Sequence, residues 1–462
     1  MPQLPAGSRL REFRQKLGAH SAILLLLYGV LSAVLSFGTL NQGPPAAAMA
    51  SRDSEIRASV AMLARGGPLL VGEVSSSAGS SLYAIGVTDD QGIYVYLPLV
   101  GHLLSINDPA VLLRILYLAA MSFALLVYPL LFAKSFGSGT IGLLAPFTLV
   151  AQIRLAPRAD IYWISAWAVV VGIPLVLVAL RLKPRGALLV LLGAAVLGSF
   201  ATSIRSQAGL PVAIAAILAA LCLSLPLRYR ISIGVLVAAA YLSISPGALG
   251  ALRLYRDAWA GRELGAGLPT AHPFWHPTYL GLGYLPNQYG IAWNDSVAAA
   301  AVERDDPGAP YLSQRYEASL RKQYLALLQR DPSFVVRTYF AKLLVVAKDA
   351  LQAWWTLLIL VPVALVFASQ RRTLLLQLAL VAPAILVNAI PPILTLPVRE
   401  YEVGWIAAWG MTWQISLGWA AIAVIAFVFG RPAPTSLSSA RADGGRRARR
   451  SRKRGRARGT PP

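Results

Sequence analysis

Residues 162–202 read YWISAWAVVVGIPLVLVALRLKPRGALLVLLGAAVLGSFAT, which is two long apolar runs joined by a short basic connection. The runs are Tyr162–Leu180 and Gly186–Thr202, and Arg181, Lys183 and Arg185 make the connection basic. An apolar run of about 20 residues is long enough to cross a hydrocarbon core about 30 Å thick. Basic connections between spans are typical of the cytoplasmic side of a membrane. This stretch therefore predicts a helical hairpin that spans a membrane and turns on its cytoplasmic side.

Similar apolar runs recur along the chain, and they predict an all-α polytopic membrane protein with about ten transmembrane helices. The composition agrees, because 56% of the 462 residues are hydrophobic and 13% are charged, whereas soluble domains usually carry about 25% charged residues. We interpret the first run as a retained helix, because it is long and no clear small-residue cleavage site follows it directly. The predicted spans are His20–Leu40, Ile115–Phe132, Thr140–Gln152, Tyr162–Leu180, Gly186–Thr202, Leu210–Leu225, Ile231–Ser245, Leu351–Ala368, Thr373–Ile390 and Gly404–Phe429.

Basic residues set the predicted topology of these spans. If the N-terminus is cytoplasmic, the cytoplasmic connections near Lys134 and at 181–185, 228–230 and 370–372 are all basic and free of acids. Residues 431–462 contain eleven Lys and Arg against one acid. We therefore predict a transmembrane domain over residues 1–430 and a disordered basic cytoplasmic tail over 431–462, in a multi-pass protein of the plasma (inner) membrane.

The formal net charge of +22 does not by itself indicate a nucleic-acid partner. More than half of the excess lies in the two chain ends, beside predicted spans. Such clusters are typical of topology signals and contacts with anionic lipids. Membrane lipids are therefore expected partners, and nucleic acid is not.

The predicted topology places two large loops outside the cytoplasm, at about residues 41–114 and 246–349. Short outer loops are expected near 154–160, 204–208 and 391–403. Within the second large loop, Tyr316–Arg330 has a helical pattern that stops before Pro332, and Phe334–Ala350 predicts a further helix. The one cysteine, Cys222, lies in an apolar run, so neither a disulfide within the chain nor a cysteine metal site is expected.

Two adjacent carboxylates, Asp89 and Asp90, open an amphipathic stretch in the first large loop. A carboxylate in apolar and like-charged surroundings can have a raised pKa and act as a general base. It can also coordinate a hard divalent cation. Asp160, with Arg158 close by, lies in a short loop on the same predicted side and is a natural partner for the pair. The alternatives are a solvated turn at Asp89-Asp90 and a salt-bridged loop at Asp160.

Other candidate groups have the chemistry of phosphate or sugar binding. Arg205 lies in a short outer turn, and a guanidinium presents a planar fork to a phosphate. His272, Trp275 and His276 lie in an aromatic-rich segment, where imidazoles suit phosphate contact or proton transfer. Arg399 lies in the last outer loop and could close a cleft. The alternatives are a snorkelling arginine, an ordered loop that packs on the membrane surface and an ordinary charged loop.

All of these groups fall on the same predicted side of the membrane, where a lipid-linked substrate presents its head group. Clusters of charged residues at membrane depth are costly and usually mark function. Their joint placement therefore favours one site at the outer interface.

This pattern resembles the GT-C superfamily of membrane glycosyltransferases over roughly residues 10–430. Members of that superfamily carry an Asp-Asp or Asp-Glu motif in the first outer loop, a second acidic position after helix three and a large late outer loop. Asp89-Asp90 with the following Tyr94 matches the first motif, and Asp160 matches the second in position. The stretch from Tyr316 to Lys342 resembles the family's helical approach to a later span.

The chain departs from the family in one respect, since only the basic tail follows the last predicted helix. Acceptor recognition is therefore expected to rest on the outer loops.

The resemblance implies transfer of a hexosyl or pentosyl group from a polyprenyl-phosphate donor to an extracytoplasmic glycan, lipid or protein acceptor. It implies that Asp89 or Asp90 is the general base and that cationic groups stabilise the leaving phosphate. Members of the superfamily differ in their use of a divalent cation (Mg or Mn), so the resemblance does not decide whether this chain requires one. If it does, Asp90 and Asp160 are the candidate ligands. The groups expected to contact the donor phosphate or the sugar are Arg158, Arg205, His272, His276, Tyr94, Trp275 and Arg399.

Three other functions stay open from the sequence. An enzyme like an O-antigen ligase or polymerase fits Arg205, His272 and His276, although an early Asp-Asp motif is less expected there. A transporter or flippase for a lipid-linked sugar would need charged groups within its spans, and the centres of these spans are nearly free of them. A non-catalytic membrane scaffold fits only if the Asp positions are dispensable.

Overall fold

The computed structural model describes residues 52–76, 79–86, 91–136, 161–266, 273–367 and 371–428, together with Leu27, Leu31 and Val34. Within these residues lie fifteen α-helices, one π-helix, one 3-10 helix and one two-stranded sheet. The bounds are α3 (Asp53–Ala64), β1 (Val71–Ser76), β2 (Gly79–Ala84), α4 (Ile93–Leu104), α5 (Pro109–Phe136), α8 (Ile161–Ala179), α9 (Pro184–Ile204), α10 (Leu210–Cys222), α11 (Leu227–Tyr241), the π-helix η1 (Ser243–Ala248), α12 (Leu249–Ala260), α13 (Trp275–Gly281), the 3-10 helix η2 (Leu282–Tyr284), α14 (Asp295–Asp305), α15 (Gln314–Arg330), α16 (Pro332–Trp354), α17 (Leu357–Phe367), α18 (Arg371–Leu394) and α19 (Arg399–Val428).

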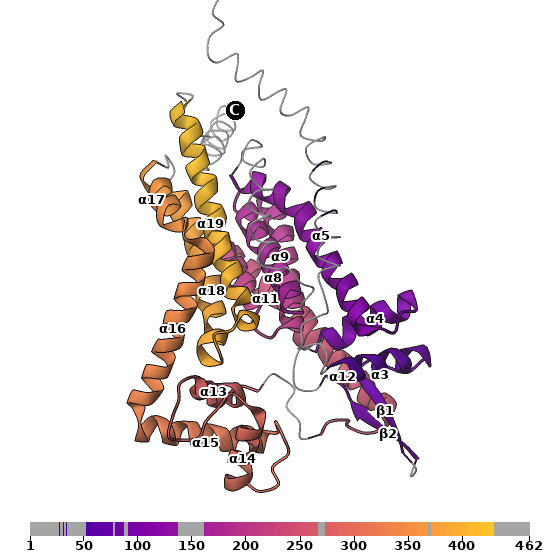
Figure 1. Cartoon of the computed structure of the whole chain (residues 1–462). Coiled ribbons are helices and arrows are strands. Elements are labelled where there is room, and N and C mark those ends of the chain that lie inside the picture. The colour runs from indigo at the N-terminus through magenta and orange to yellow at the C-terminus, as the bar shows by residue number, and fades with distance from the viewer. Residues whose placement is uncertain are drawn as a thin grey trace, which may run out of the picture.

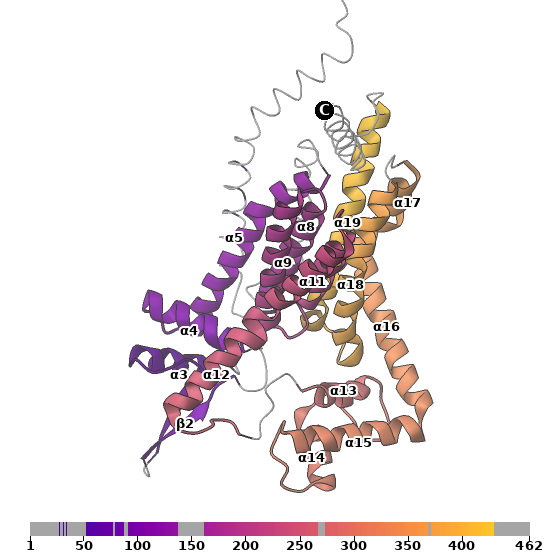
Figure 2. The same ribbon diagram turned by 180° about the vertical axis from the view of Figure 1, so that it is seen from behind.

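The described helices form an elongated bundle with further elements at one of its ends (Figure 1). Helices α5, α8, α9, α10, α11, α17, α18 and α19 make up the bundle, and α16 runs along it from that end. The view from behind gives the same arrangement (Figure 2). The two segments predicted as large outer loops, 41–114 and 246–349, therefore place their described elements at the same end of the bundle.

Three described helices, α5, α9 and α18, are long and apolar enough to cross a membrane. Two helix pairs pass the same test together but are bent: α11 with residues 243–260 by 46°, and α16 with residues 357–366 by 70°. The described residues thus contain three candidate spans, or up to five if each bent pair is one span. The prediction of a mostly helical chain is confirmed, and some of its helices are long and apolar enough to cross a membrane.

The predicted count of about ten spans is not confirmed. The predicted spans His20–Leu40 and Thr140–Gln152 lie outside the described residues, apart from Leu27, Leu31 and Val34. Helix α10 has 13 residues, which is about 20 Å of helix against a hydrocarbon core of about 30 Å.

The predicted span Leu351–Ala368 is wrong as one straight helix. Helix α16 ends at Trp354, and the chain bends by 70° before α17. The apolar run continues through this bend, so hydrophobicity alone does not reveal it.

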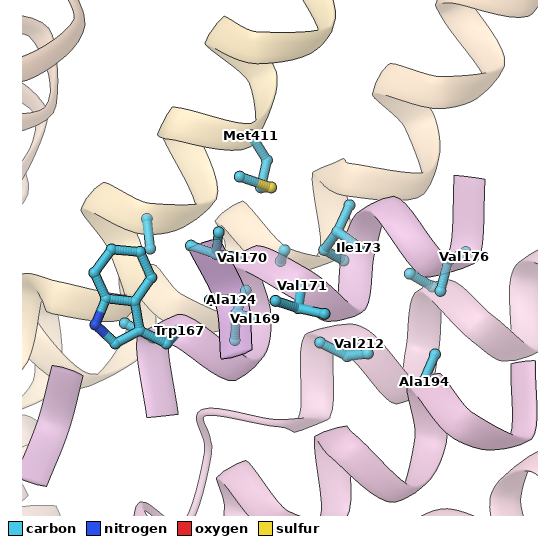
Figure 3. Close-up of a cluster of buried hydrophobic side chains, with 14 of the residues drawn as sticks. Ala124, Trp167, Val169, Val170, Val171, Ile173, Val176, Ala194, Val212 and Met411 are labelled. Atoms are coloured by element: carbon cyan, nitrogen blue, oxygen red, sulfur yellow. The ribbon is translucent and has the colours of Figure 1, made fainter. Parts of the chain in front are cut away.

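Small and branched side chains fill the bundle interior (Figure 3). Gly172 on α8 makes room for Val212 on α10, because a Cβ there would lie 2.6 Å from Val212 Cγ1. Gly198 and Gly209 bring the backbones of α9 and α10 into contact in the same way. Lipid is as apolar as a leucine side chain, so close packing through small residues is what associates helices in a membrane. Figure 3 labels Ala124, Trp167, Val169, Val170, Val171, Ile173, Val176, Ala194, Val212 and Met411.

Two buried glutamines connect helices within the bundle. Gln377 on α18 accepts a hydrogen bond through Oε1 from Trp419 Nε1 on α19 at 2.7 Å. Gln414 on α19 accepts one from the Tyr128 hydroxyl on α5. An unsatisfied polar group in apolar surroundings is costly. These bonds therefore favour one relative arrangement of α5, α18 and α19.

We define the first lobe as α3, β1, β2 and α4. Strand β1 pairs antiparallel with β2, with Val71 opposite Ala84 and Gly72 opposite Tyr83. A Cβ on Gly72 would overlap the Tyr83 ring, so glycine is needed for this pair. The all-α prediction is therefore wrong in the first large loop. The strands are short and rich in Ser and Gly, which gives a weak strand signal.

Met62, Val71 and Leu264 form a small buried cluster at the first lobe. The cluster joins α3 and β1 to the segment that follows α12. Residues about 190 positions apart in the sequence therefore share one small core.

We define the second lobe as residues 273–345, which include α13, η2, α14, α15 and the first part of α16. Its own core is built around buried residues such as Tyr316, Leu320 and Phe334. Asp331 Oδ1 accepts a hydrogen bond from the Phe334 N–H at 3.0 Å, and Pro332 takes the first helical position of α16. The predicted helices at 316–330 and 334–350 are confirmed as α15 and α16.

Candidate functional site

The predicted site residues divide into those that the structure describes and those that it does not. Asp89, Asp90, Arg158, Asp160 and His272 lie outside the described residues. Arg399 is the first residue of α19, and its side chain lies outside the description as well. The predicted site side chains that the structure places are Tyr94, Arg205, Trp275 and His276.

The chain just after the Asp-Asp motif is fixed to the C-terminal end of α9. The Gly92 N–H donates to the Ser203 carbonyl at 2.7 Å. The Tyr96 hydroxyl lies 2.7 Å from Ser203 Oγ. Ser203 Oγ uses its one proton toward the Phe200 carbonyl, so Tyr96 is the donor. A Cβ on Gly92 would lie 2.7 Å from the Ser203 carbonyl oxygen, which makes glycine necessary at this approach.

Arg205 follows α9 directly and lies where the bundle meets the second lobe. Its guanidinium carbon is 5.3 Å from the centre of the Tyr401 ring on α19. The Tyr401 ring is in turn 6.0 Å from the Trp293 ring, centre to centre, and Trp293 packs against the core of the second lobe. A cation also suits the negative end of the α9 dipole. Segments from the first loop, the turn at 204–208 and the loop at 391–403 thus meet near Arg205.

Tyr94 is buried, and its ring packs against Gly86. A Cβ on Gly86 would lie 2.5 Å from Tyr94 Cδ2, and Gly86 has a positive φ of 62° that favours glycine. This contact holds together the two ends of the segment that carries Asp89 and Asp90. In this structure Tyr94 has a packing role, and its ring is 7% exposed.

A cavity of about 520 Å³ lies beside Gln91, the residue that follows Asp90. Arg253 and Arg256 of α12 line it, together with the acids Asp257 and Glu263 and with Leu264. Arg256 is buried and donates to Asp257 Oδ1 at 2.8 Å and to the Leu264 carbonyl at 2.7 Å. These bonds fix the Arg256–Asp257 ion pair in the wall of the cavity.

The same cavity has apolar walls from Pro246 in η1 and Leu254 in α12. Leu254 is 74% exposed, so the apolar side continues onto the surface of α12. Asp257 and Glu263 balance the two arginines in the lining, so the cavity combines a polar, charged side with an apolar one and suits a polar head group on an apolar chain. The sequence reasoning missed Arg253 and Arg256, because their approach to Gln91 depends on the 46° bend at η1.

His276 lies inside the second lobe, away from the contacts around Arg205. Its Nδ1 is 3.0 Å from the Tyr316 hydroxyl and its Nε2 is 3.2 Å from Asp295 Oδ1. A carboxylate only accepts, so these partners assign the proton to Nε2 and make Tyr316 the donor to Nδ1. Burial, with the Asp295 carboxylate next in importance, raises the pKa of nearby Tyr311 to about 12. Both ring nitrogens of His276 are engaged by the lobe itself.

The backbone around Trp275 is held by one carboxylate. Glu317 accepts hydrogen bonds from the backbone N–H groups of Phe274, Trp275 and His276 at 2.8, 2.7 and 2.9 Å. This arrangement fixes the start of α13 against α15. Residues 274–276 are therefore held in a defined conformation at the start of α13.

The sequence matches no known family. No protein-family model matches the chain, and a search of curated proteins found no significant match. The chemistry of the site therefore rests on its own residues.

A pair of carboxyl groups that the sequence reasoning left out of its site lies between α16 and α19. Glu402 is 3% exposed and lies beside Asp349. Burial, and next the Asp349 carboxylate, raise the pKa of Glu402 to about 7. Glu402 Oε1 has no hydrogen-bond partner among the described residues. Glu402 follows Tyr401 directly, so this acid lies beside the Arg205 contact.

The described residues contain no group of three or more His, Cys, Asp or Glu side chains that could hold a metal ion. Asp90 and Asp160, the candidate ligands, lie outside the described residues.

Proposed function

We propose that this chain is a membrane glycosyltransferase that moves a sugar from a polyprenyl-phosphate donor to an extracytoplasmic glycan, lipid or protein acceptor. The observation that carries the proposal is the meeting of Gly92, Arg205 and Tyr401 at one end of the bundle. It brings the chain next to Asp90 close to a cation, at the end where both lobes lie.

The proposed topology has about ten spans, with the N- and C-termini in the cytoplasm and the site on the other side. It rests on the basic connections and on the three to five candidate spans among the described residues. Under this topology the cavity beside Gln91 opens where the head group of a lipid-linked donor lies.

The proposed reaction uses Asp89 or Asp90 as a general base. The carboxylate takes the proton from an acceptor hydroxyl, and the acceptor oxygen forms a bond to the anomeric carbon. The bond from that carbon to the phosphate oxygen breaks, and the polyprenyl phosphate leaves with the bonding electrons. Arg205 and Arg253 are the described cations that we assign to stabilising the phosphate.

The test is transfer of label from radiolabelled polyprenyl-phosphate sugars in membranes that contain the full chain. We expect Asp89→Asn or Asp90→Asn to lower transfer at least about 100-fold, as expected for loss of a general base. Arg205→Gln should lower it about 10- to 100-fold through loss of phosphate stabilisation. Asp108→Asn changes an exposed acid in the same predicted loop and should leave transfer unchanged.

Full activity in both aspartate variants would disprove the base assignment. If no sugar is transferred and labelled lipid instead becomes accessible on the other leaflet, the chain is a flippase and the proposal fails.

A further inference from the structure

The second lobe carries an open groove of about 760 Å³ along α15. Gln314, Ala318, Arg321, Leu325 and Gln329 line it at spacings of three and four residues, which places them on one face of the helix. The side chains of Ala318 and Leu325 are exposed. This face is therefore not covered by any described part of the chain.

Trp275 forms the wall of the groove opposite this helix face. Its ring lies 5.6 Å from Tyr324 and meets Phe274 edge-on at 5.0 Å, centre to centre. Its backbone N–H is bound by Glu317, which ties the residue to α15. Trp275 is thus a rigid aromatic surface that is ready before any ligand arrives, which lowers the entropic cost of binding.

The charges in the groove are not balanced. The Glu317 carboxylate already accepts hydrogen bonds from three backbone N–H groups. Lys322 is held by Asp305 at 2.6 Å. Arg321 is exposed, and within the described chain its contact is with the Trp275 ring, 5.8 Å from the guanidinium carbon. Its N–H groups therefore stay available for an anionic group beside the aromatic wall.

We propose that this groove binds an anionic glycan, with one sugar ring against Trp275 and a carboxylate or phosphate of the same glycan at Arg321. A guanidinium fork matches the two oxygens of such a group. The amides of Gln314 and Gln329 supply donors and acceptors for hydroxyls along the helix face. The identification of the occupant as a glycan rests on the proposed function, and the groove would then recognise the acceptor.

The test is isothermal titration calorimetry on the full-length protein in detergent, with tetragalacturonate as the anionic probe and maltotetraose as the uncharged one. We expect tetragalacturonate to bind at least tenfold more tightly than maltotetraose. Arg321→Gln should remove that difference, and Trp275→Phe should weaken the binding of tetragalacturonate about tenfold. The thermal unfolding of each variant is measured alongside to confirm that it folds.

Arg330→Gln is the matched control. Arg330 lies on the same helix with its guanidinium carbon 5.9 Å from the Tyr289 ring, and it does not line the groove. This variant should bind both probes as the wild type does.

Several outcomes would overturn the proposal. Absence of binding by the wild type, or equal affinity for the two probes, would remove the anionic glycan as the occupant. A dimer in sedimentation that Trp275→Phe and Arg321→Gln dissociate would make a second copy of the chain the occupant. The binding assay contains no donor lipid, so its failure and the failure of the proposed function can be told apart. A wild type that binds tetragalacturonate but transfers no sugar contradicts only the proposed function, and a wild type that transfers sugar but does not bind the probe contradicts only this proposal.

Discussion

Lys342 is fully buried, and its ammonium group donates hydrogen bonds to three backbone carbonyls. The carbonyls belong to Gly281 (2.9 Å), Leu394 (3.2 Å) and Thr395 (2.9 Å). Gly281 ends α13 in the second lobe, whereas Leu394 and Thr395 end α18 of the bundle. A single side chain on α16 thus joins the lobe to the bundle.

We expect Lys342→Met to destabilise the protein by about 3 kcal/mol, because three buried carbonyls would lose their donor and unmade hydrogen bonds cost about 1–3 kcal/mol each. Thermal unfolding in detergent measures the effect. Lys348→Met on the same helix removes an exposed ammonium and should change little. If Lys342→Met unfolds at the wild-type temperature, Lys342 does not hold the two parts together.

Glu402 makes the stability depend on pH. It precedes the predicted span Gly404–Phe429, and its pKa is raised from the ordinary 4.5 to about 7, first by burial and then by Asp349. The folded state therefore binds this proton more tightly than the unfolded state, so the stabilisation is complete below about pH 4.5 and is lost as the pH rises through about 7.

Glu402→Gln should remove this loss, since glutamine stays neutral. At pH 8 we expect the variant to be more stable than the wild type by on the order of 2 kcal/mol, and at pH 4.5 to match it. Thermal unfolding at several pH values measures the difference, with the exposed acid Glu303 changed to Gln as the control. A variant that parallels the wild type at every pH would rule out Glu402 as the titrating group.

Between elements, the contact of α4 with the end of α9 is the arrangement on which the proposed function depends. Gly92→Ala would place a methyl group 2.7 Å from the Ser203 carbonyl oxygen and 2.8 Å from Ser203 Oγ. Overpacking of this kind typically costs about 1–3 kcal/mol. We expect sugar transfer to fall at least about tenfold, because the chain next to Asp90 is displaced from Arg205.

Gly193→Ala in the middle of α9 is the comparison for this variant. No atom lies within 4 Å of a Cβ placed there, and alanine favours a helix over glycine by about 1 kcal/mol. Gly193→Ala should therefore keep its transfer activity and its stability. Equal activity in the two glycine variants would show that the α4–α9 contact does not position the site.

For the molecule as a whole, apolar runs were sufficient to predict a mostly helical chain with helices long and apolar enough to cross a membrane. Helix ends with a local signal were also predictable, as Asp331-Pro332 between α15 and α16 shows. The bend after Trp354 was not predictable, because the apolar run continues through it. The π-helix at 243–248 was not predictable either, because the predicted span ends at Ser245 and the helix continues beyond it into α12. The hairpin at 71–84 was missed because its residues have low strand propensity.

The candidate site was predictable in part for the same reason. The basic connections predict one side of the membrane for both Arg205 and the loop that holds Tyr401, and the structure brings these two residues into contact. The pairing of Glu402 with Asp349 joins residues 53 positions apart, and only the packing of α19 on α16 creates it. The sequence suggested a chemical role for His276, because histidine is common in active sites. In the structure both of its ring nitrogens are bonded to residues of the second lobe.

The small cluster of Met62, Val71 and Leu264 has a consequence for biosynthesis. A ribosome that adds about 5–20 residues per second makes Leu264 roughly 10–40 s after Val71. During that interval the apolar side of α3 and β1 lacks the side chain that later covers it. The first lobe is therefore among the earliest parts of the chain to be synthesised, yet it is completed only after the helices from α5 to α12 have been made.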